Sequence, residues 1–457
     1  MKSEAVLVIG AGRTGEACAE VLAARGIDVY VTDEQPPVKL ERAIAAIRSA
    51  GGQFVAPSQV ESLLPKVDRA ILSPGVPLAG TLAQKAKASV PLVGEIEVAY
   101  ELCQAPIIAV TGTKGKSTTT ALTAHLLRCA GKAVRVGGNI GNPLIREAAL
   151  ATRNEWIVAE VSSFQLETIE KFKPRIAVLL NVSDDHLDRY ASLDEYASAK
   201  FRIFENQDAD DIFIGNLDDP FVAAARPRIR AKAFWFSARG SDSEASAFAS
   251  DDGIWYRTRG RTARRLLHRS EIALPGEHNL ENVLAATLAA LSAGATISNV
   301  IESVPAFEPM QHRLQTIAEI EGVRYVDDSK ATNPAAVIAA LQSFSGPVVL
   351  IAGGKSKGAD LSQLGKSIRD RVKALIALGE AAEPLARAST GTPTIRAATL
   401  QDAVQRARQE ASSGDIVLLS PGFASFDMFS SAEERGERFA AIVKDLERNA
   451  LRETAGA

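Results

Sequence analysis

The residues best suited to do chemistry lie in a glycine-containing loop, TGTKGKST, at positions 111–118. The apolar run before this loop predicts a buried strand, and the pattern that follows predicts a helix. Such a loop surrounds phosphates with backbone N–H groups, while Lys116 can reach the β and γ oxygens of ATP and Ser117 can hold Mg²⁺. A lysine-bearing turn that merely caps a helix is the weaker interpretation. The candidate ATP-binding residues of the loop are Gly112, Thr113, Lys114, Gly115, Lys116, Ser117 and Thr118.

Three further side chains could complete a catalytic site around this loop. Glu160 closes the strand WIVAE, and a carboxylate with buried flanks needs a partner, for which Mg²⁺ is suitable. His186 follows another strand in NVSDDHLDRY; a lone histidine is usually structural, but a loop rich in acidic residues favours a role in the site. Lys200 lies in a helical pattern, YASAKFRIF, where most lysines are solvated, so its position alone does not single it out.

A second glycine pattern, G-x-G-x-x-G, is formed by Gly10, Gly12 and Gly15 directly after a predicted strand. Asp33 ends the next strand, so the pattern alone is typical of a dinucleotide site, with close packing of a helix on a strand as the alternative. Ser73 follows a further strand and should reach the same carboxyl edge, where open α/β sheets bind ligands.

Length and composition restrict the classes of protein to consider. A chain of 457 residues, 46% of them hydrophobic, predicts about three domains with substantial cores. Charged residues are nearly balanced, with a formal net charge of -3, which argues against a general nucleic-acid binder but leaves anionic small molecules open. The three cysteines show neither disulfide nor zinc spacing. Because there is neither a signal peptide nor a long apolar run, we expect a cytoplasmic protein that does not insert into a membrane.

Apolar runs alternate with helical patterns along the chain, which predicts an α/β fold of parallel sheets with covered faces. Boundaries near residues 95 and 306 divide the chain into three predicted domains, 1–95, 96–305 and 306–457. Within the second domain, stretch 232–275 is poor in helix signals and predicts small antiparallel strands. The runs that predict buried strands are AVLVIG, DVYVTD, RAILSP, IIAVTG, WIVAEVSS, AVLLNVSDDH, RYVDDS, VVLIAGG, ALIALGE and IVLLSPG.

Several motifs together resemble the Mur ligases, the ATP-dependent ligases of bacterial cell-wall synthesis. The matching segments cover nearly the whole chain in family order: TGTKGKST, GGNIG (137–141), EVSSFQLE (160–167), NVSDDHLDRY (181–190), GEHNLEN (276–282), HR (312–313), DDSKATN (327–333) and LLSPGFASFD (418–427). The resemblance implies an N-terminal Rossmann-like domain that binds UDP in place of a dinucleotide, a central P-loop-like ATPase domain and a C-terminal Rossmann-like domain that binds glutamate. It implies ligation of D-glutamate to UDP-N-acetylmuramoyl-L-alanine through an acyl phosphate, in the peptidoglycan synthesis that supports cell shape and division.

The resemblance also assigns roles to individual residues. The implied catalytic residues are Lys116, Glu160, His186 and Lys200. Two Mg²⁺ ions are implied, the first held by Ser117 and Glu160 and the second by His186 and by Lys200 as a carbamate, whose anionic oxygen suits a hard cation. Further implied ATP contacts are Asn279, Asn282, Arg313 and Asp328; the UDP-linked precursor is placed against Thr14, Asp33, Ser73, Asn139, Ser162, Ser163 and Gln165, and glutamate against Lys330, Thr332, Lys357, Ser425 and Phe426.

Two positions depart from the family pattern. Lys114 replaces a common asparagine and adds a charge near the triphosphate, and Ala432 replaces an aromatic residue that often lines the glutamate pocket, which leaves the choice of D- over L-glutamate open. Other classes to weigh are a nicotinamide-dependent dehydrogenase, which leaves the ATP loop unexplained, and a folylpolyglutamate-synthetase-like ligase, which lacks the first domain. A non-catalytic nucleotide sensor would have lost the metal ligands that this chain keeps. We expect a monomer that acts on small molecules and binds no nucleic acid.

Overall fold

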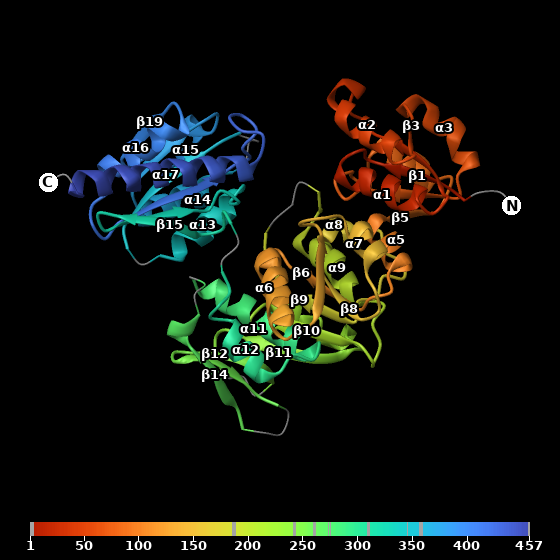
Figure 1. Ribbon diagram of the computed structural model, residues 1–457, viewed down its shortest axis with the longest axis horizontal. Helices are drawn as coiled ribbons and strands as arrows, with labels where there is room; N and C mark the ends of the chain where they lie inside the picture. The colour runs from red at the N-terminus through yellow and green to blue at the C-terminus, as the bar shows by residue number, and fades with distance from the viewer. Residues whose placement is uncertain are drawn as a thin grey trace. The chain divides into compact units, whose positions relative to one another are not determined.

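The computed structural model describes residues 4–184, 189–240, 244–258, 262–272, 274, 276–308, 311–344, 346–355 and 360–455. The chain forms two compact units, one made of Met1–Ile272 and His278–Phe307 and the other containing Glu308–Ala457. The first unit holds two sheets and the second holds one, with helices packed against each (Figure 1). This α/β architecture of mainly parallel sheets confirms the predicted fold class. The boundaries near 95 and 306 stay a prediction.

The N-terminal sheet has five parallel strands in the order β3-β2-β1-β4-β5. Its middle strand is the apolar run AVLVI, which is buried along its whole length because helices cover both faces. The first glycine loop follows this strand and therefore lies at the carboxyl edge of the sheet. The elements are β1 (Ala5–Ile9), α1 (Arg13–Ala23), β2 (Asp28–Thr32), α2 (Glu41–Ser49), β3 (Gln53–Phe54), α3 (Val60–Leu63), β4 (Arg69–Leu72), α4 (Thr81–Lys87) and β5 (Leu92–Gly94).

The central sheet has nine strands in the order β14-β13-β12-β11-β10-β9-β6-β8-β7. From β7 to β12 every pair is parallel, so the loops that follow these strands gather at one edge. The strands are β6 (Ile107–Thr111), β7 (Ala133–Gly138), β8 (Glu155–Glu160), β9 (Ile176–Leu179), β10 (Ile212–Asn216), β11 (Lys232–Ser237), β12 (Ala245–Ser250), β13 (Gly253–Tyr256) and β14 (Arg264–His268). The helices are α5 (Glu95–Leu102), α6 (Lys116–Cys129), α7 (Leu144–Leu150), α8 (Ser163–Leu166), α9 (Leu193–Phe201), α10 (Pro220–Ala224), α11 (Glu277–Ser292) and α12 (Ile297–Ser303).

The prediction for stretch 232–275 is partly wrong. Strands β13 and β14 pair antiparallel, as predicted, and so do β12 and β13. Strand β11, however, is parallel to β10 and continues the main sheet. Its sequence, KAFWFS, carries aromatic residues that pack into the core of this sheet, and the short helix α10 precedes it, so it belongs to the parallel layer.

Helix α5 joins the N-terminal sheet to the central one and is fixed by two buried carboxylates. Glu95 accepts the backbone N–H of Ile145 at the start of α7 (2.6 Å), and α5 packs along α7. Glu97 accepts three successive backbone N–H groups, those of Glu170, Lys171 and Phe172, at 2.8, 2.7 and 2.9 Å. Burial raises the pKa of Glu95 to about 7, because the charged form is poorly solvated there.

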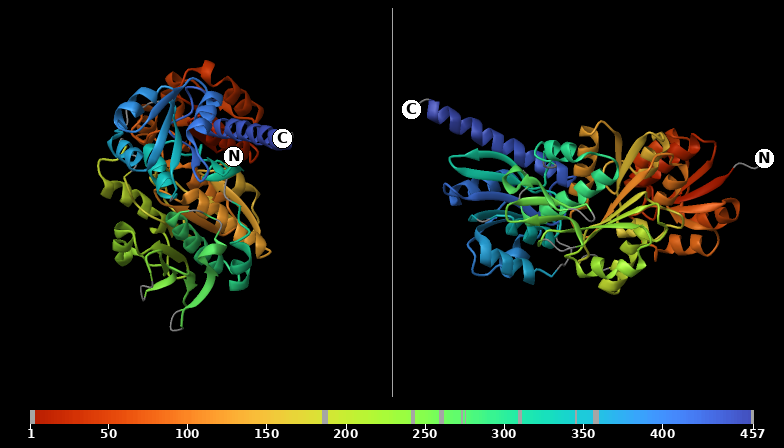
Figure 2. Two further views of the ribbon diagram at one scale, coloured as in Figure 1. Left: turned by 90° about the vertical axis from the view of Figure 1, so that its left-hand side faces the viewer. Right: turned by 90° about the horizontal axis from the view of Figure 1, so that it is seen from below.

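The second unit contains a six-stranded sheet in the order β15-β16-β20-β17-β18-β19, parallel except for β15. The loops after β16, β17 and β20 share its carboxyl edge. Figure 2 shows α17 as one long straight helix that leads to the C-terminus. The elements are β15 (Gln315–Ile320), β16 (Val323–Asp327), α13 (Pro334–Gln342), β17 (Val348–Gly353), α14 (Ser362–Arg371), β18 (Val372–Leu378), α15 (Ala382–Ala388), β19 (Thr394–Ala397), α16 (Leu400–Glu410), β20 (Ile416–Gly422) and α17 (Ala432–Ala455).

Two further expectations concern the chain as a whole. Cys18, Cys103 and Cys129 are free thiols in the structure. Among the described residues, no helix has both the length and the apolar character needed to cross a membrane.

Candidate active site

The predicted phosphate-binding loop, residues 111–118, lies between β6 and α6, as the sequence predicts; it is called the phosphate-type loop below. Gly115 ends the loop with φ +83, and a Cβ atom there would lie 2.2 Å from Oδ1 of Asn282, so only glycine fits. The same Asn282 oxygen accepts the hydroxyl of Thr119 (3.2 Å), and its Nδ2 donates to Oδ1 of Asn279 (2.9 Å). Both asparagines, predicted as ATP contacts, are therefore brought from α11 to the start of α6.

Two lysines converge on the carbonyl oxygen of Gly112. Lys116 Nζ donates to it (2.9 Å) and to the carbonyl of Thr113 (2.8 Å), and Lys200 Nζ donates to it from α9 (2.9 Å). Lys200 is only 1% exposed and lies over the ring of Tyr196, 4.3 Å from its centroid. The helical pattern alone predicted a solvated lysine, so its burial beside the loop is a structural finding that the pattern missed.

The loop after β9 supports the phosphate-type loop. Oδ1 of Asn181 accepts the backbone N–H groups of Thr113 (3.0 Å) and Lys114 (2.9 Å), and the backbone N–H of Ser183 donates to the hydroxyl of Thr113 (3.0 Å). Sequence reasoning gave Asn181 no role, although an amide that directly follows a strand end was the available signal. His186 lies outside the described residues, so its predicted role in the site stays a prediction.

Glu160 ends β8 beside this loop and is 2% exposed. Asn139 donates to it twice, from its backbone N–H to the Glu160 carbonyl (2.8 Å) and from Nδ2 to Oε1 (2.7 Å). The other carboxylate oxygen, Oε2, is buried and has no hydrogen-bond partner among the described residues. A buried carboxylate oxygen without a partner is costly unless a cation completes its coordination, so Glu160 fits the predicted Mg²⁺ ligand.

The donor set for a metal ion is small. Among the residues that the structure describes, no group of three or more His, Cys, Asp or Glu side chains could hold a metal ion by itself. Ser117 is buried in the first turn of α6 and can supply a hydroxyl oxygen. One carboxylate, one hydroxyl and the oxygens of a bound triphosphate are the kind of set that Mg²⁺ takes in nucleotide sites.

The predicted UDP contacts lie at the carboxyl edge of the N-terminal sheet. Asp33 accepts the backbone N–H of Ala11 (2.8 Å), and the hydroxyl of Ser73 donates to the carbonyl of Gly10 (3.1 Å). Both side chains therefore hold the first glycine loop in place, and Thr14 lies in the first turn of the helix that follows. The structure thus brings Asp33 and Ser73 to the first glycine loop, and their contact with UDP stays a prediction.

The predicted muramoyl contacts in EVSSFQLE begin a short helix. Ser162 is its N-cap: its hydroxyl accepts the backbone N–H of Gln165 (3.2 Å), while Oε1 of Gln165 accepts the backbone N–H of Ser162 (2.9 Å). This reciprocal pair is a capping box, and Ser163 is buried next to it. Ser162 and Gln165 thus have a structural task at this helix start, which lies at the same sheet edge as Glu160.

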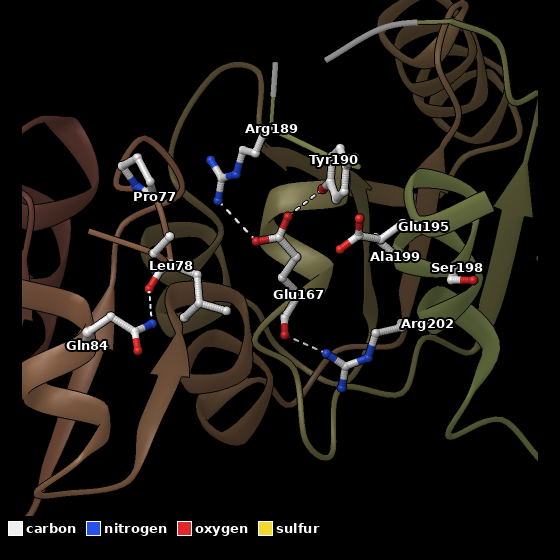
Figure 3. Close-up of a pocket in the computed structure, with 11 residues that line it drawn as sticks. Pro77, Leu78, Gln84, Glu167, Arg189, Tyr190, Glu195, Ser198, Ala199 and Arg202 are labelled. Atoms are coloured by element: carbon white, nitrogen blue, oxygen red, sulfur yellow. Dashed lines mark hydrogen bonds and ion pairs between the residues drawn. The ribbon is translucent and has the colours of Figure 1, made fainter. Parts of the chain in front are cut away.

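The last residue of that motif, Glu167, connects it to Arg189 and Tyr190, for which no role was predicted from the sequence. Its carboxylate accepts the hydroxyl of Tyr190 and a guanidinium N–H of Arg189 (3.0 Å) (Figure 3). The guanidinium carbon of Arg189 also lies 3.8 Å from the centroid of the Phe164 ring. Burial and this carboxylate raise the pKa of the Tyr190 hydroxyl far above its usual value. The network borders a cavity of about 490 Å³ lined by Pro77, Leu78, Ala79, Gln84, Glu167, Arg189, Tyr190, Glu195, Ser198, Ala199 and Arg202.

In the second unit, Asp328 follows β16 and is buried. Burial raises the pKa of its carboxyl to about 7, against hydrogen bonds from the hydroxyl of Ser420 (2.8 Å) and the backbone N–H of Leu314 (3.3 Å) that favour the charged form. The positive charge of Arg313 also lowers the pKa of Asp328. The two predicted ATP contacts of this unit are therefore neighbours.

A buried network beside them was missed in the sequence. Nδ1 of His312 lies 2.7 Å from Oδ2 of Asp327, and Arg435 on α17 donates to the hydroxyl (3.0 Å) and the carbonyl (2.9 Å) of Ser329. Burial lowers the pKa of Arg435 to about 10. Because His312 precedes Arg313, and Ser329 follows Asp328, these contacts fix the backbone that carries the predicted ATP contacts.

The predicted glutamate contacts lie in loops after β16 and β20. Lys330 forms an ion pair with Glu433, and Thr332 is exposed. Ser425 is buried, whereas Phe426 is 68% exposed, so the apolar wall that it could provide is solvated. The structure brings these positions to one sheet edge, the carboxyl edge of the sheet in the second unit.

Two more positions belong to the predicted glutamate site. Lys357 lies outside the described residues, so its assignment stays a prediction. Ala432 is the first residue of α17, and its carbonyl accepts the hydroxyl of Ser329 (2.7 Å). Since this contact uses only the backbone, replacing the usual aromatic side chain by alanine leaves it intact.

Comparisons with known proteins agree along the whole chain. Residues 4–94 match the model of the Mur ligase MurD-like N-terminal domain, 110–290 the Mur ligase middle domain and 312–423 the Mur ligase glutamate ligase domain. The UDP-N-acetylmuramoylalanine–D-glutamate ligase of Pelotomaculum thermopropionicum is 41% identical over 97% of this chain and 98% of its own. The enzyme of the same name from Geotalea daltonii is 42% identical over 98% of each chain.

Solved structures give the same fold at lower identity. A pseudomurein peptide ligase type C from Methanothermus fervidus aligns with a TM-score of 0.61 and 18% identity, covering 97% of this chain and 100% of the other. UDP-N-acetylmuramate-alanine ligase MurC from Thermotoga maritima aligns with a TM-score of 0.60 and 19% identity, covering 96% and 99%. At such identities the likeness concerns the fold alone.

Proposed function

The chain belongs to the Mur ligase family, and we propose that it joins D-glutamate to UDP-N-acetylmuramoyl-L-alanine with hydrolysis of ATP, in peptidoglycan precursor synthesis. The observation that carries this proposal is the match, at 41% and 42% identity over nearly complete chains, to relatives named as D-glutamate ligases. The ATP loop and Glu160 supply the chemistry that such a ligation requires. A dehydrogenase would leave both without a purpose.

The first step of the proposed reaction activates a carboxylate. The carboxylate of the alanyl group attacks the γ-phosphorus of ATP, giving an acyl phosphate and ADP. Carboxylate and triphosphate repel each other, so the backbone N–H groups of the loop and the ammonium of Lys116 must offset the negative charge. Ser117 and Glu160 would hold a Mg²⁺ ion, which would further neutralise the phosphate oxygens.

The second step forms the amide bond. The amine of glutamate attacks the acyl carbon, and the tetrahedral adduct collapses to the amide and inorganic phosphate. Acyl phosphates hydrolyse readily, so water has to be kept away until the amine attacks. We assign binding of glutamate to the sheet edge of the second unit, through Lys330, Thr332, Lys357, Ser425 and Phe426.

A second Mg²⁺ ion and a carbamate on Lys200 are finer parts of the proposal. Addition of CO₂ to the Lys200 amine would turn a cation into an anionic oxygen donor beside the phosphate-type loop. The position of Nζ, 2.9 Å from the Gly112 carbonyl, supports this assignment, and His186 would complete the ligand set.

An isotope experiment tests the activation step. The precursor is prepared with ¹⁸O in its terminal carboxylate and incubated with ATP, Mg²⁺ and D-glutamate, and the released phosphate is analysed by mass spectrometry. One ¹⁸O atom should pass to each phosphate, because the carboxylate oxygen leaves with it. Phosphate without label, or product only when a folate replaces the muramoyl precursor, would contradict the proposal and favour a folylpolyglutamate-synthetase-like ligase.

A further inference from the structure

A buried acidic side chain without an assigned role lies behind the loop that carries Asn139. Glu147 on α7 is 8% exposed; its Oε1 accepts Nδ2 of Asn142 (2.7 Å), and its Oε2 lies 3.5 Å from Nη1 of Arg135. A Cβ atom on Gly137 would lie 2.9 Å from Cγ of Glu147. The Cγ methylene of Glu147 therefore packs against Gly137 at the start of the loop, and its carboxylate binds Asn142 at the end of the loop.

The loop between these two points is closed and tight. The backbone N–H of Gly138 donates to the carbonyl of Asn142 (2.8 Å), and Gly137 and Asn142 form an isolated bridge. Gly138 has φ +103, and a Cβ atom there would lie 2.2 Å from the carbonyl oxygen of Glu160. This loop, residues 138–142, thus contacts Glu160 at its first residue and Glu147 at its last residue.

A continuous set of contacts therefore runs from Glu147 to the metal-binding carboxylate. Glu147 accepts from Asn142, the backbone of Asn142 closes the loop, and Asn139 within the loop donates to both the carbonyl and Oε1 of Glu160. Because a carboxylate can only accept, Oε1 of Glu160 is held by the Asn139 amide, while Oε2 is buried and has no hydrogen-bond partner among the described residues.

We propose that Glu147 is a positioning residue which, through Asn142, holds Asn139 against Glu160 and so sets the orientation of the metal-binding carboxylate. The proposal rests on the proposed function for the metal ion at Glu160. Groups that orient a metal ligand act on metal affinity without touching the ion, and their removal commonly lowers affinity about 10- to 100-fold. Glu147 does not contact Glu160 itself and would act on it through Asn142 and Asn139.

Metal binding without turnover tests this proposal. Mn²⁺ is titrated into the full-length protein with ADP present, and free Mn²⁺ is followed by electron paramagnetic resonance. We expect Glu147→Ala and Asn142→Ala each to weaken Mn²⁺ binding about tenfold. Glu147→Gln should stay within about threefold of the wild type, because its amide oxygen can still accept from Asn142.

A matched control comes from the same ion-pair cluster. Glu155 also binds Arg135 (Nε to Oε1, 3.0 Å) but does not contact Asn142, so Glu155→Ala should leave Mn²⁺ binding unchanged. Affinity for UDP, measured by calorimetry, should be equal in all variants, because that ligand is assigned to the N-terminal sheet. Equal Mn²⁺ affinity in Glu147→Ala and Glu155→Ala would overturn the proposal, as would parallel losses of UDP and Mn²⁺ affinity.

Two further outcomes are distinguishable. If Glu147→Ala does not fold, Asn142→Ala decides, because it breaks the same link and keeps the buried carboxylate paired with Arg135; normal Mn²⁺ binding in that variant would contradict the proposal. A wild-type protein that binds Mn²⁺ in this way but forms no amide product would contradict the proposed function and leave the role of Glu147 supported.

Discussion

Lys116 and Lys200 donate to the same acceptor, the carbonyl oxygen of Gly112, at 2.9 Å in each case. One lysine starts the helix after the phosphate-type loop, and the other comes from a helix 84 positions later in the chain. Their meeting point places two nitrogen-bearing side chains of different expected chemistry on one loop: an ammonium that neutralises phosphate and an amine that can take up CO₂. Each role gives a separate prediction.

Replacing Lys116 should remove phosphoryl transfer while sparing the precursor site. We expect Lys116→Ala to lower kcat at least about 100-fold, the usual scale for removing one group that stabilises transition-state charge. UDP affinity should stay unchanged, because Asp33 and Ser73 hold that site at another sheet. Steady-state phosphate release measures the turnover, and calorimetry measures the UDP affinity. A variant that keeps a tenth of wild-type turnover would refute the role of Lys116 in phosphoryl transfer.

Replacing Lys200 tests the carbamate. Lys200→Ala should be nearly inactive, and a short carboxylate such as acetate, added at millimolar concentration, should restore part of the activity by supplying the lost anionic oxygen. Lys171→Ala is the matched control, since Lys171 is exposed and contributes only its backbone N–H to Glu97. Full activity in Lys200→Ala would show that this lysine serves packing alone.

Arg13 connects the two loops to which the precursor is assigned. Its guanidinium, in the first glycine loop, donates to the carbonyl of Gly141 in the loop that carries Asn139. We expect Arg13→Ala to weaken the binding of UDP-N-acetylmuramoyl-L-alanine about 3- to 10-fold, the usual net contribution of one solvent-exposed hydrogen bond, and to leave the binding of UDP itself unchanged because UDP needs only one loop. Calorimetry with both ligands tests this, with Arg25→Ala as control; equal loss for both would refute the bridging role.

Glu95 should make the first unit less stable as the pH rises. Its pKa is raised from 4.5 to about 7, so the folded protein keeps a proton that the unfolded chain has lost, and the resulting stabilisation disappears as the pH passes the folded value. About 1 kcal/mol should be lost between pH 6 and pH 8. Urea unfolding followed by tryptophan fluorescence measures this, because the tryptophans at 156, 235 and 255 all lie in this unit.

Glu95→Gln provides the comparison for that experiment. The amide is neutral at both pH values, and its oxygen can still accept from Ile145, so the pH-dependent part of the unfolding free energy should shrink by the same amount. An identical pH dependence in wild type and variant would mean that Glu95 does not titrate in this range.

Most of the sheet cores could be predicted from the sequence, because buried parallel strands read as continuous apolar runs. Strand β6 (IIAVT) is an example. Strand β7 (AVRVGG) was not predicted: it lies at the sheet edge, is mostly half-buried and carries Arg135, so it lacks that signal. Strand β3 was missed because two residues are too short to form a pattern.

In the candidate site, too, some residues could be predicted from the sequence and others could not. Loop residues such as Lys116 could be predicted because one local segment determines their geometry. The burial of Lys200, the link from Glu147 to Asn142 and the pair His312–Asp327 depend on elements that meet only in the folded chain. Helix periodicity does not report which neighbour covers a given face, so these roles required the structure.

We propose that this chain adds D-glutamate to the muramoyl-alanine precursor. One reaction tests it: the wild-type protein with ATP, Mg²⁺, UDP-N-acetylmuramoyl-L-alanine and an equal mixture of ¹³C-labelled D-glutamate and unlabelled L-glutamate, with the product measured by mass spectrometry. A D-glutamate ligase should give a product that carries the ¹³C label almost exclusively. An unlabelled product, an equal mixture of both masses, or ATP hydrolysis without any ligated product would contradict it.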